Sequence, residues 1–255
     1  MRNTRLNEME KMIARSGTIS MTELCEHFQV SMNTVRRDIA ELKRRGEIEK
    51  VYGGVTSVKS VQEHLSSYDE RMQVSEASKQ AICRKAAELI QDGDIIFVDS
   101  GTTTAHLPEY LTDCSEVTIV TNNLALVQKA IPYENLRVIV LPGQLRRKTN
   151  SLTGMDTISK LRQYNVQKAF LATTGTTQDG VTNSSPQELE IKRIAIECSQ
   201  KKILLVGEEK FGHAGLMTYG KFTDFDYIVT DRVPQQPYLD AIRKAGAVLL
   251  TAEKK

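Results

Sequence analysis

The sequence predicts an α/β protein with an N-terminal winged helix-turn-helix and a larger C-terminal domain built on a mainly parallel sheet. Two short amphipathic helical patterns joined by a tight turn, and a glycine-containing hairpin pattern after them, predict the first part. Short apolar runs that alternate with helical patterns from residue 76 onward predict the second. With 255 residues, 40% of them hydrophobic and 26% charged, the chain is long enough for one small and one larger domain.

The segment 18–45 has the spacing of two short helices. Leu24 and Phe28 are four residues apart in the first helix. The apolar positions of the second helix, at intervals of four and three, are Val35, Ile39 and Leu42. Each helix therefore has one apolar stripe that must face a core.

Capping residues mark where both helices begin. Ser20 precedes the first helix and Glu23 follows three residues later, which is a capping-box pattern. Ser31 precedes the second helix, where its hydroxyl can accept from a backbone N–H. These starts leave a tight turn between the helices.

The second helix has a polar, cationic face opposite its apolar stripe. At about 100° per residue, the side away from Val35 carries Asn33, Arg37, Ala40 and Arg44, with Thr34 and Arg36 on the flanks. Asparagine can pair with adenine, and arginine with guanine or a phosphate oxygen, so this face suits a DNA groove. The alternative is an ordinary solvent-exposed helix surface. Because the formal net charge is only +2, the basic signal is local.

A hairpin or wing is predicted directly after this helix. Gly46 can end the helix, and residues 47–58 contain two short strand patterns around Tyr52-Gly53-Gly54. With the T-x-R-R-D run at residues 34–38, these residues resemble the DeoR/GlpR family of bacterial transcriptional repressors. The candidate DNA-contacting residues are Ser31, Asn33, Thr34, Arg36, Arg37, Arg44 and Tyr52.

Residues 59–75 are polar, Ser-rich and weakly periodic, which predicts a linker. The predicted domains are residues 1–58 for DNA binding and residues 76–255 for effector sensing. Seven apolar runs predict strands in the second domain: Ile95 to Val98, Val117 to Val120, Val138 to Leu141, Ala169 to Ala172, Ile203 to Val206, Ile228 to Val229 and Val248 to Leu250. Ligands of parallel sheets bind beyond the carboxyl ends of the strands, so the loops after these runs are the place to look for a site.

The loop after the first run, residues 99–104, has the composition of a phosphate cradle. Gly101 allows close backbone approach, and Thr102 and Thr103 supply hydroxyl donors before a helix-like segment. Asp99 would repel phosphate, so it either accepts from a sugar hydroxyl or orients the loop. The alternative for this loop is an ordinary capped turn.

Three further segments are weaker candidates when taken alone. Asn122 either binds a hydroxylated ligand or caps the next helix. Residues 142–148 collect three cations after a strand; their plainest interpretation is exposed charge, and the alternative is that one of them faces the pocket and binds phosphate. Glu188 and Lys192 are four residues apart, so their plainest interpretation is an ion pair within one helix.

The family resemblance extends from about residue 4 to residue 250. The loop motifs occur in the same order along this chain as in DeoR-type sensor domains. Those domains look like sugar-phosphate isomerases that kept the pocket. The resemblance implies that the effector-binding residues are Asp99, Gly101, Thr102, Thr103, Asn122, Gly143, Arg146, Gly175, Glu188, Lys192 and Lys210. Residues 48–57 look closest to the inositol-catabolism repressors. The chain departs from the family pattern at Gly207-Glu208-Glu209, and only one glycine follows Pro142.

The resemblance implies a repressor of sugar, polyol or cyclitol catabolic genes that is induced by a phosphorylated sugar or related intermediate. The expected partners are double-stranded operator DNA, the effector and identical subunits, in a homodimer or homotetramer. We expect no catalytic residue. The main alternative is an isomerase-like enzyme with Glu188 or Asp99 as general base and Lys192 as electrophile. A sugar-phosphate storage or scaffold module, and an activator, are further alternatives.

The remaining residue types indicate neither a metal site nor a membrane protein. The four cysteines are scattered, and the sole pairing at short spacing, Cys25-x-His27, points two ways on a helix. We therefore expect no metal and no cofactor. The sequence has no charged-then-apolar leader and no apolar run near 18 residues, so we expect a cytoplasmic protein without membrane contact.

Overall fold

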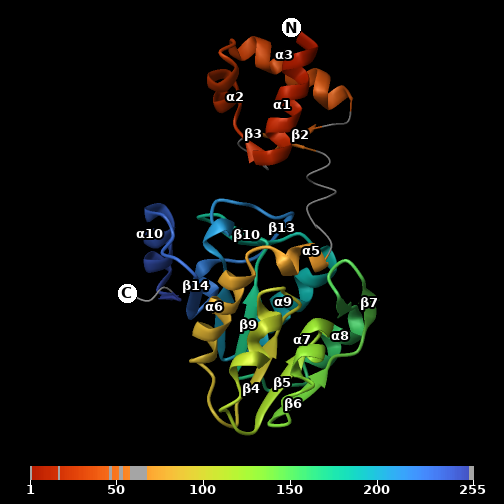
Figure 1. Ribbon diagram of the computed structural model, residues 1–255, viewed down its shortest axis with the longest axis vertical. Coiled ribbons are helices and arrows are strands. Elements are labelled where there is room, and N and C mark those ends of the chain that lie inside the picture. Colours follow the sequence, from red (N-terminus) through yellow and green to blue (C-terminus); the bar gives the residue numbers. More distant parts are fainter. Residues whose placement is uncertain (1, 17, 46–47, 52–53, 58–67, 253–255) are drawn as a thin grey trace. The chain divides into compact units, whose positions relative to one another are not determined.

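The computed structural model describes residues 2–16, 18–45, 48–51, 54–57 and 68–252 (Figure 1). The chain divides into two compact units between Leu65 and Ser66. Here the first is called the N-terminal unit and the second the sensor unit. Among the described residues, no helix combines the length and apolarity needed to span a bilayer.

The N-terminal unit has the predicted helix-turn-helix and both strands of the predicted wing. Its elements are α1 (Arg2–Ser16), β1 (Thr18–Ile19), α2 (Met21–Phe28), α3 (Met32–Arg44), β2 (Ile48–Val51) and β3 (Gly54–Ser57). The three strands pair antiparallel in the order β1-β3-β2. A Cβ at Gly54 would lie 2.1 Å from the carbonyl oxygen of Ile19, so glycine is needed where β3 meets β1. Tyr52 and Gly53 lie outside the described residues.

The apolar stripes of the helices form the core of this unit, as the spacing predicts. The fully or almost fully buried side chains are Leu6, Met9, Ile13, Ile19, Leu24, Val35, Ile39, Leu42, Ile48 and Val55. The capping box is confirmed, because Ser20 N donates to Glu23 Oε2 (2.8 Å) and Ser20 Oγ accepts from Glu23 N (3.1 Å). Gln29, in the left-handed region with φ 50°, ends α2 and starts the tight turn. Helix α1 was not predicted, although Leu6, Met9 and Ile13 have helical spacing.

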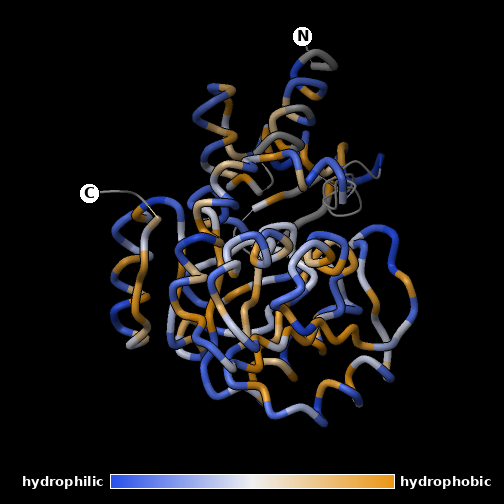
Figure 2. Tube along the Cα trace, turned by 60° about the horizontal axis from the view of Figure 1, so that its bottom comes forward, coloured by the Kyte–Doolittle hydropathy of each residue, from blue (hydrophilic) through white to orange (hydrophobic). Residues whose placement is uncertain are grey.

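The seven strands predicted for the second domain form one parallel sheet. They are β4 (Ile95–Val98), β5 (Val117–Thr121), β6 (Leu136–Val140), β9 (Lys168–Ala172), β12 (Lys201–Leu205), β14 (Tyr227–Thr230) and β15 (Val248–Thr251). Their spatial order is β15-β14-β12-β9-β4-β5-β6, and every neighbouring pair is parallel. The central strands β4, β9 and β12 are apolar and buried over most of their residues, and Figure 2 shows hydrophilic and hydrophobic stretches alternating along the helices.

Helices cover both faces of this sheet. On one face lie α6 (Glu76–Ala87), the 3-10 helix η1 (Thr104–Tyr110) and α7 (Leu124–Ala130), which pack through Ile82, Leu107 and Leu126. The other face carries α8 (Met155–Leu161), α9 (Pro186–Cys198) and α10 (Gln236–Ala245). Consecutive residues of β4 alternate between these two cores, with Ile96 in the first and Phe97 in the second.

Short elements lie in the connections between the strands of the large sheet. They are the hairpin β7 (Gln144–Arg146) and β8 (Ser151–Thr153), the small antiparallel sheet of β10 (Gly175–Thr176), β11 (Val181–Asn183) and β13 (Met217–Gly220), and the 3-10 helices η2 (Glu208–Lys210) and η3 (Phe222–Asp224). None of these elements was predicted, because segments of two to four residues have too little periodicity to detect.

The predicted linker is too long at its carboxyl end. Residues 68–73 form the helix α5 (Tyr68–Gln73), and Tyr68 is buried against the sensor unit. The segment is polar because only one side of this short helix is covered, so its composition resembles that of a linker.

Candidate DNA-binding face and effector site

Helix α3 presents the predicted polar face to solvent. Asn33, Arg36, Arg37 and Arg44 are exposed, Thr34 is half-buried, and Val35 on the opposite side is completely buried. The N-terminal end of α3 therefore carries two guanidinium groups and one amide that can reach a partner. Their contact with DNA stays a prediction.

The motif aspartate Asp38 has a structural role. Nε and Nη2 of Arg5 in α1 both donate to Asp38 Oδ2, each at 2.8 Å. Asp38 is 1% exposed, so this interaction joins α1 to α3 beneath the polar face. The sequence motif thus combines outward-facing arginines with one inward-facing carboxylate that fixes their helix.

Three of the candidate DNA-contacting residues, Ser31, Thr34 and Arg44, have intramolecular partners. Ser31 Oγ accepts from Thr34 N (3.3 Å) and lies 3.0 Å from Thr34 Oγ1, so it caps α3. Arg44 Nη2 donates to Glu41 Oε1 (2.9 Å), and Arg45 Nε contacts the same oxygen (3.1 Å). Because Glu41 neutralises part of this end of the helix, we expect phosphate contacts from Asn33, Arg36 and Arg37 to dominate over those from Arg44.

In the sensor unit, Asp99 is the centre of a buried network at the end of β4. Its Oδ1 accepts from Gly101 N (3.0 Å) and Thr104 Oγ1 (2.7 Å), and its Oδ2 accepts from Ala172 N (2.8 Å) and Lys192 Nζ. Asp99 is 1% exposed. A carboxylate that accepts from these four donors orients the loop, which is one of the two roles predicted for Asp99. Because its oxygens are already engaged, it is poorly placed to act as a general base.

The predicted intrahelical ion pair between Glu188 and Lys192 is wrong. Lys192 Nζ instead binds Asp99 and donates to Ala172 O (2.9 Å), and it lies 5.2 Å from the ring centre of Tyr219. Glu188 Oε1 accepts from Ser100 Oγ (2.6 Å) and Ser151 Oγ (2.8 Å). Both side chains face the sheet, where each lies closer to partners that are distant in sequence than to the other.

The candidate glycines are required for close packing. A Cβ at Gly101 would lie 2.3 Å from Ala172 Cβ, one at Gly143 would lie 2.4 Å from Thr157 Oγ1, and one at Gly175 would lie 2.3 Å from His213 O. Since Gly101 N–H donates to Asp99, it is not available to a phosphate in this arrangement. The glycines thus shape the loops, whatever ligand the loops bind.

The two neighbouring asparagines after β5 have different roles. Asn123 caps α7, because its Oδ1 accepts from Ala125 N (3.1 Å) and Leu126 N (3.2 Å). Asn122 does not cap the helix; its Nδ2 donates to Leu152 O (3.0 Å). Asn122 is 1% exposed, and its Oδ1 has no hydrogen-bond partner among the described residues. An unsatisfied buried amide oxygen is costly, and a hydroxyl donor would satisfy it.

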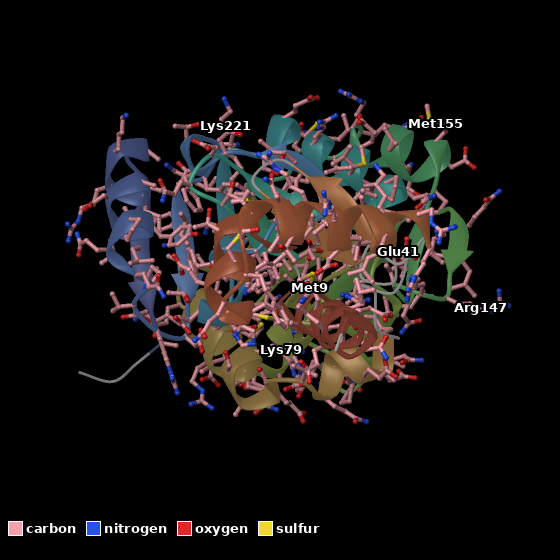
Figure 3. The ribbon with its side chains drawn as sticks, turned by 90° about the horizontal axis from the view of Figure 1, so that it is seen from above. Met9, Glu41, Lys79, Arg147, Met155 and Lys221 are labelled. Atoms are coloured by element: carbon pink, nitrogen blue, oxygen red, sulfur yellow. The ribbon has the colours of Figure 1, made fainter. Side chains whose placement is uncertain are left out.

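The three basic residues of the β7–β8 hairpin differ in the contacts that they make. Arg146 Nη2 donates to Gln187 Oε1 (3.2 Å) in the first turn of α9, next to Glu188. Arg147 extends away from the sensor unit at its periphery (Figure 3). The carbonyl of Lys148 accepts from Arg71 Nη2 (3.1 Å). Of the three, Arg146 is the one held beside the Glu188 network.

Lys210 and the threonines of the first loop complete the candidate set. Lys210 Nζ donates to Thr173 O (3.1 Å) at the end of β9, and burial lowers its pKa while Glu209 opposes that change. Thr102 and Thr103 are 6% and 1% exposed, and the carbonyl of Thr103 accepts from Cys83 Sγ (2.9 Å). All of these residues lie in segments that follow parallel strands of the sheet.

Several participants were missing from the sequence-based set. They are Ser100, Thr104, Thr149, Ser151, Ala172 and Tyr219. Ser100 and Thr104 lie within the loop that sequence analysis did select. Tyr219 OH donates to Ala172 O (2.9 Å), and burial raises the pKa of Tyr219 well above its ordinary value. Only its tertiary position reveals this contact, because β13 has no recognisable motif.

The chain matches two family models and several known regulators. A family model described as "DeoR C terminal sensor domain" matches residues 74–232, and one described as "DeoR-like helix-turn-helix domain" matches residues 5–61. The "HTH-type transcriptional regulator IolR" of Bacillus subtilis (strain 168) is 41% identical over 239 residues, covering 93% of this chain and 94% of that protein. The glycerol-3-phosphate regulon repressor of Escherichia coli (strain K12) is 31% identical over 231 residues, covering 90% and 91%.

Solved structures match parts of the chain at low identity. One is a D-ribose-5-phosphate isomerase in complex with phospho-erythronic acid, with 17% identity and a TM-score of 0.40. The match covers 53% of this chain and 54% of that one.

Proposed function

Because this chain belongs to the DeoR family of helix-turn-helix transcriptional regulators, we propose that it represses carbohydrate catabolic genes and is induced by a phosphorylated sugar or related intermediate. Membership of a family of regulators argues against the isomerase alternative. The carboxylate of Asp99 also argues against it, because both of its oxygens already accept hydrogen bonds within the protein. The regulated genes would serve the breakdown of a sugar, polyol or cyclitol.

This proposal depends on one observation: the same chain contains an exposed cationic recognition helix and a separate sensor unit. Asn33, Arg36 and Arg37 extend from α3 into solvent while the opposite side of α3 is buried. Asparagine and arginine of a recognition helix read base edges and hold phosphates. Identical subunits would place two such helices in repeated half-sites.

The chemistry of the sensor site supports a hydroxylated, anionic effector. The unsatisfied Oδ1 of Asn122 can accept from a ligand hydroxyl, and Lys210 and Arg146 offer positive charge to a phosphoryl group. A phosphorylated polyol also occurs in the name of one relative, the glycerol-3-phosphate regulon repressor.

Induction requires the effector to distinguish two states of the protein. A ligand relieves repression only if it binds the DNA-incompetent arrangement more tightly than the DNA-bound one. A tenfold loss of DNA affinity needs about 1.4 kcal/mol of differential binding. A few hydrogen bonds made in only one arrangement supply this amount.

The proposal is tested with the full chain and duplexes that the chain itself selects from a random-sequence pool. Binding is then measured by fluorescence anisotropy while glucose 6-phosphate, ribose 5-phosphate, glycerol 3-phosphate and phosphorylated inositols and sugar acids are added in turn. The unphosphorylated parent compounds serve as controls. Release by one phosphorylated compound alone would support the proposal. Failure to select any duplex, or no release by any compound, would contradict it.

A further inference from the structure

Helix α5 is the first described element after residues 58–67, and it belongs to the sensor unit. Tyr68 is 6% exposed and packs with Ala105 of η1 and Ala125 of α7. Because η1 and α7 follow β4 and β5, α5 lies over the edge of the sheet where Asp99 and Asn122 are found (Figure 1). The start of the sensor unit is therefore next to the candidate effector site.

Arg71 joins α5 to other parts of this site. Its Nη2 donates to Lys148 O (3.1 Å) in the β7–β8 hairpin, and its guanidinium carbon lies 5.6 Å from the ring centre of Tyr68. Burial lowers the pKa of Arg71, and the negative charge of Glu188 opposes this change. The guanidinium thus contacts the hairpin, and the negative charge of Glu188 favours its protonated form.

The hydroxyl of Tyr68 has no hydrogen-bond partner among the described residues. Buried phenol hydroxyls usually have one. Burial raises the pKa of Tyr68; Arg71 lowers it, and the carboxylates of Asp99 and Glu188 raise it further. Because Tyr68 packs on η1 and α7, a ligand that satisfies this hydroxyl would lie at the edge of the sheet where β4 and β5 end.

Two lysines add positive charge near Arg71. Lys79 of α6 is 6% exposed and donates to the carbonyl oxygens of Arg71 and, at 3.4 Å, Met72. Burial and the charge of Lys210 lower the pKa of Lys79 to about 8, and the charge of Arg71 contributes to the lowered pKa of Lys210. Glu209 opposes both shifts. An anion bound among these cations would relieve their mutual repulsion.

We propose that Arg71 and Tyr68 of α5 are effector-binding residues, with Arg71 and Lys210 holding a phosphoryl group and the Tyr68 hydroxyl completing the contact. This inference rests on the proposed function, which it deepens by naming the segment that receives the signal. Since α5 directly follows the segment that joins the two units, a ligand held by α5 acts on the chain where it enters the sensor unit. Effector binding and release of DNA are thereby linked through one short helix.

The experiment uses the full chain with inorganic phosphate as the minimal anion, against sodium chloride at equal ionic strength. We expect phosphate to raise the thermal unfolding midpoint and to slow hydrogen exchange of the amides in residues 68–79. Arg71→Ala should weaken phosphate binding about tenfold or more, because a charge-assisted contact is lost. Tyr68→Phe should weaken it severalfold without lowering the midpoint measured in sodium chloride, since the ring and its packing remain.

Arg147→Ala is the matched control, because Arg147 is an exposed arginine beside Lys148 on the same hairpin and points away from the sensor unit. This variant should bind phosphate as the wild type does. Arg71→Lys keeps the charge but loses the planar donor fork, and it replaces Arg71→Ala if that variant does not fold. Weaker phosphate binding by Arg71→Lys supports the proposal, and unchanged binding contradicts it.

Two further outcomes would overturn the inference. One is a wild type that responds to phosphate no more than to sodium chloride. The other is an Arg71→Ala variant that a phosphorylated compound still releases from DNA at the wild-type concentration, in which case the proposed function stands and only the role of α5 falls. If no compound releases the wild type, the proposed function itself fails.

Discussion

The recognition face of α3 and the sensor site are built in opposite ways. The exposed residues Asn33, Arg36 and Arg37 come from one helical turn and a neighbouring position, and they point into solvent. The sensor residues come from loops after separate strands and are buried, as in the contact between Asp99 and Lys192 across 93 positions of sequence. A surface residue is available to a partner without being needed for folding, whereas a buried site residue supports the fold and the site together.

The largest expected effect is on the stability of the sensor unit in Lys192→Met. Removing the ammonium leaves the carboxylate of Asp99 buried without its charged partner, and such changes cost about 3 to 5 kcal/mol. Urea unfolding, with hydrogen exchange in β9 as the local probe, measures the loss. Adding Asp99→Asn to this variant should restore part of the stability. A change below about 1 kcal/mol would show that the pair is less important than its burial suggests.

Substitutions in the recognition face of α3 should instead lower DNA affinity and leave stability nearly unchanged. Arg37→Ala removes an exposed guanidinium, so we expect DNA affinity to fall by about 1 to 3 kcal/mol and the salt dependence to become shallower. Its stability should change by less than about 0.5 kcal/mol. Arg45→Ala, at the end of α3 and paired with Glu41, is the matched control and should affect binding less. Equal losses for both variants would remove the special status of the N-terminal end of α3.

A pH titration can detect the cationic cluster around α5. The pKa of Lys79 is lowered from 10.5 to about 8 by burial and then by Lys210 and Arg71, against Glu209 and Glu76. The unfolded chain therefore holds this proton more tightly, so stability should rise with pH above about 8. We expect about 1 to 2 kcal/mol, allowing for solvent screening.

Urea unfolding of wild type and Lys79→Met between roughly pH 7.5 and 9.5 isolates this contribution, because other groups titrate in both proteins. The rise attributable to Lys79 should be absent from the variant. Parallel stability curves for the two proteins would contradict the depressed pKa.

The smallest expected effect is on the turn that precedes α2. Ser20→Ala removes the acceptor for Glu23 N, and loss of such a cap costs about 1 kcal/mol. Faster hydrogen exchange in residues 21–28, with no change in β9, would show that the cost stays within the N-terminal unit. Ser20→Gly should cost only a few tenths of a kcal/mol, since glycine is tolerated at this position. Equal effects of both substitutions would argue against the side-chain cap.

Sequence periodicity predicted the elements well but not the partners of buried polar groups. The seven parallel strands and the helix-turn-helix followed from apolar spacing. Glu188 and Lys192 have ideal spacing for an ion pair, yet each turns toward residues from other strands. Likewise, the sequence does not distinguish Asn122 from Asn123 as the N-cap of α7, and only the fold shows that Asn123 is the cap. Helix α5 was taken for linker because its composition is polar.

By itself, the sequence determined the class of the protein, the order of its strands along the chain and the exposed face of α3. These depend on interactions among residues a few positions apart, whose geometry is fixed by the helical and extended repeats. The tertiary structure alone decided which side chains meet at the carboxyl end of the sheet, including Asp99 with Lys192 and α5 with the candidate site. Such contacts join residues many positions apart, and the cost of leaving a polar group unpaired in a low-dielectric interior favours whichever partner the fold brings near.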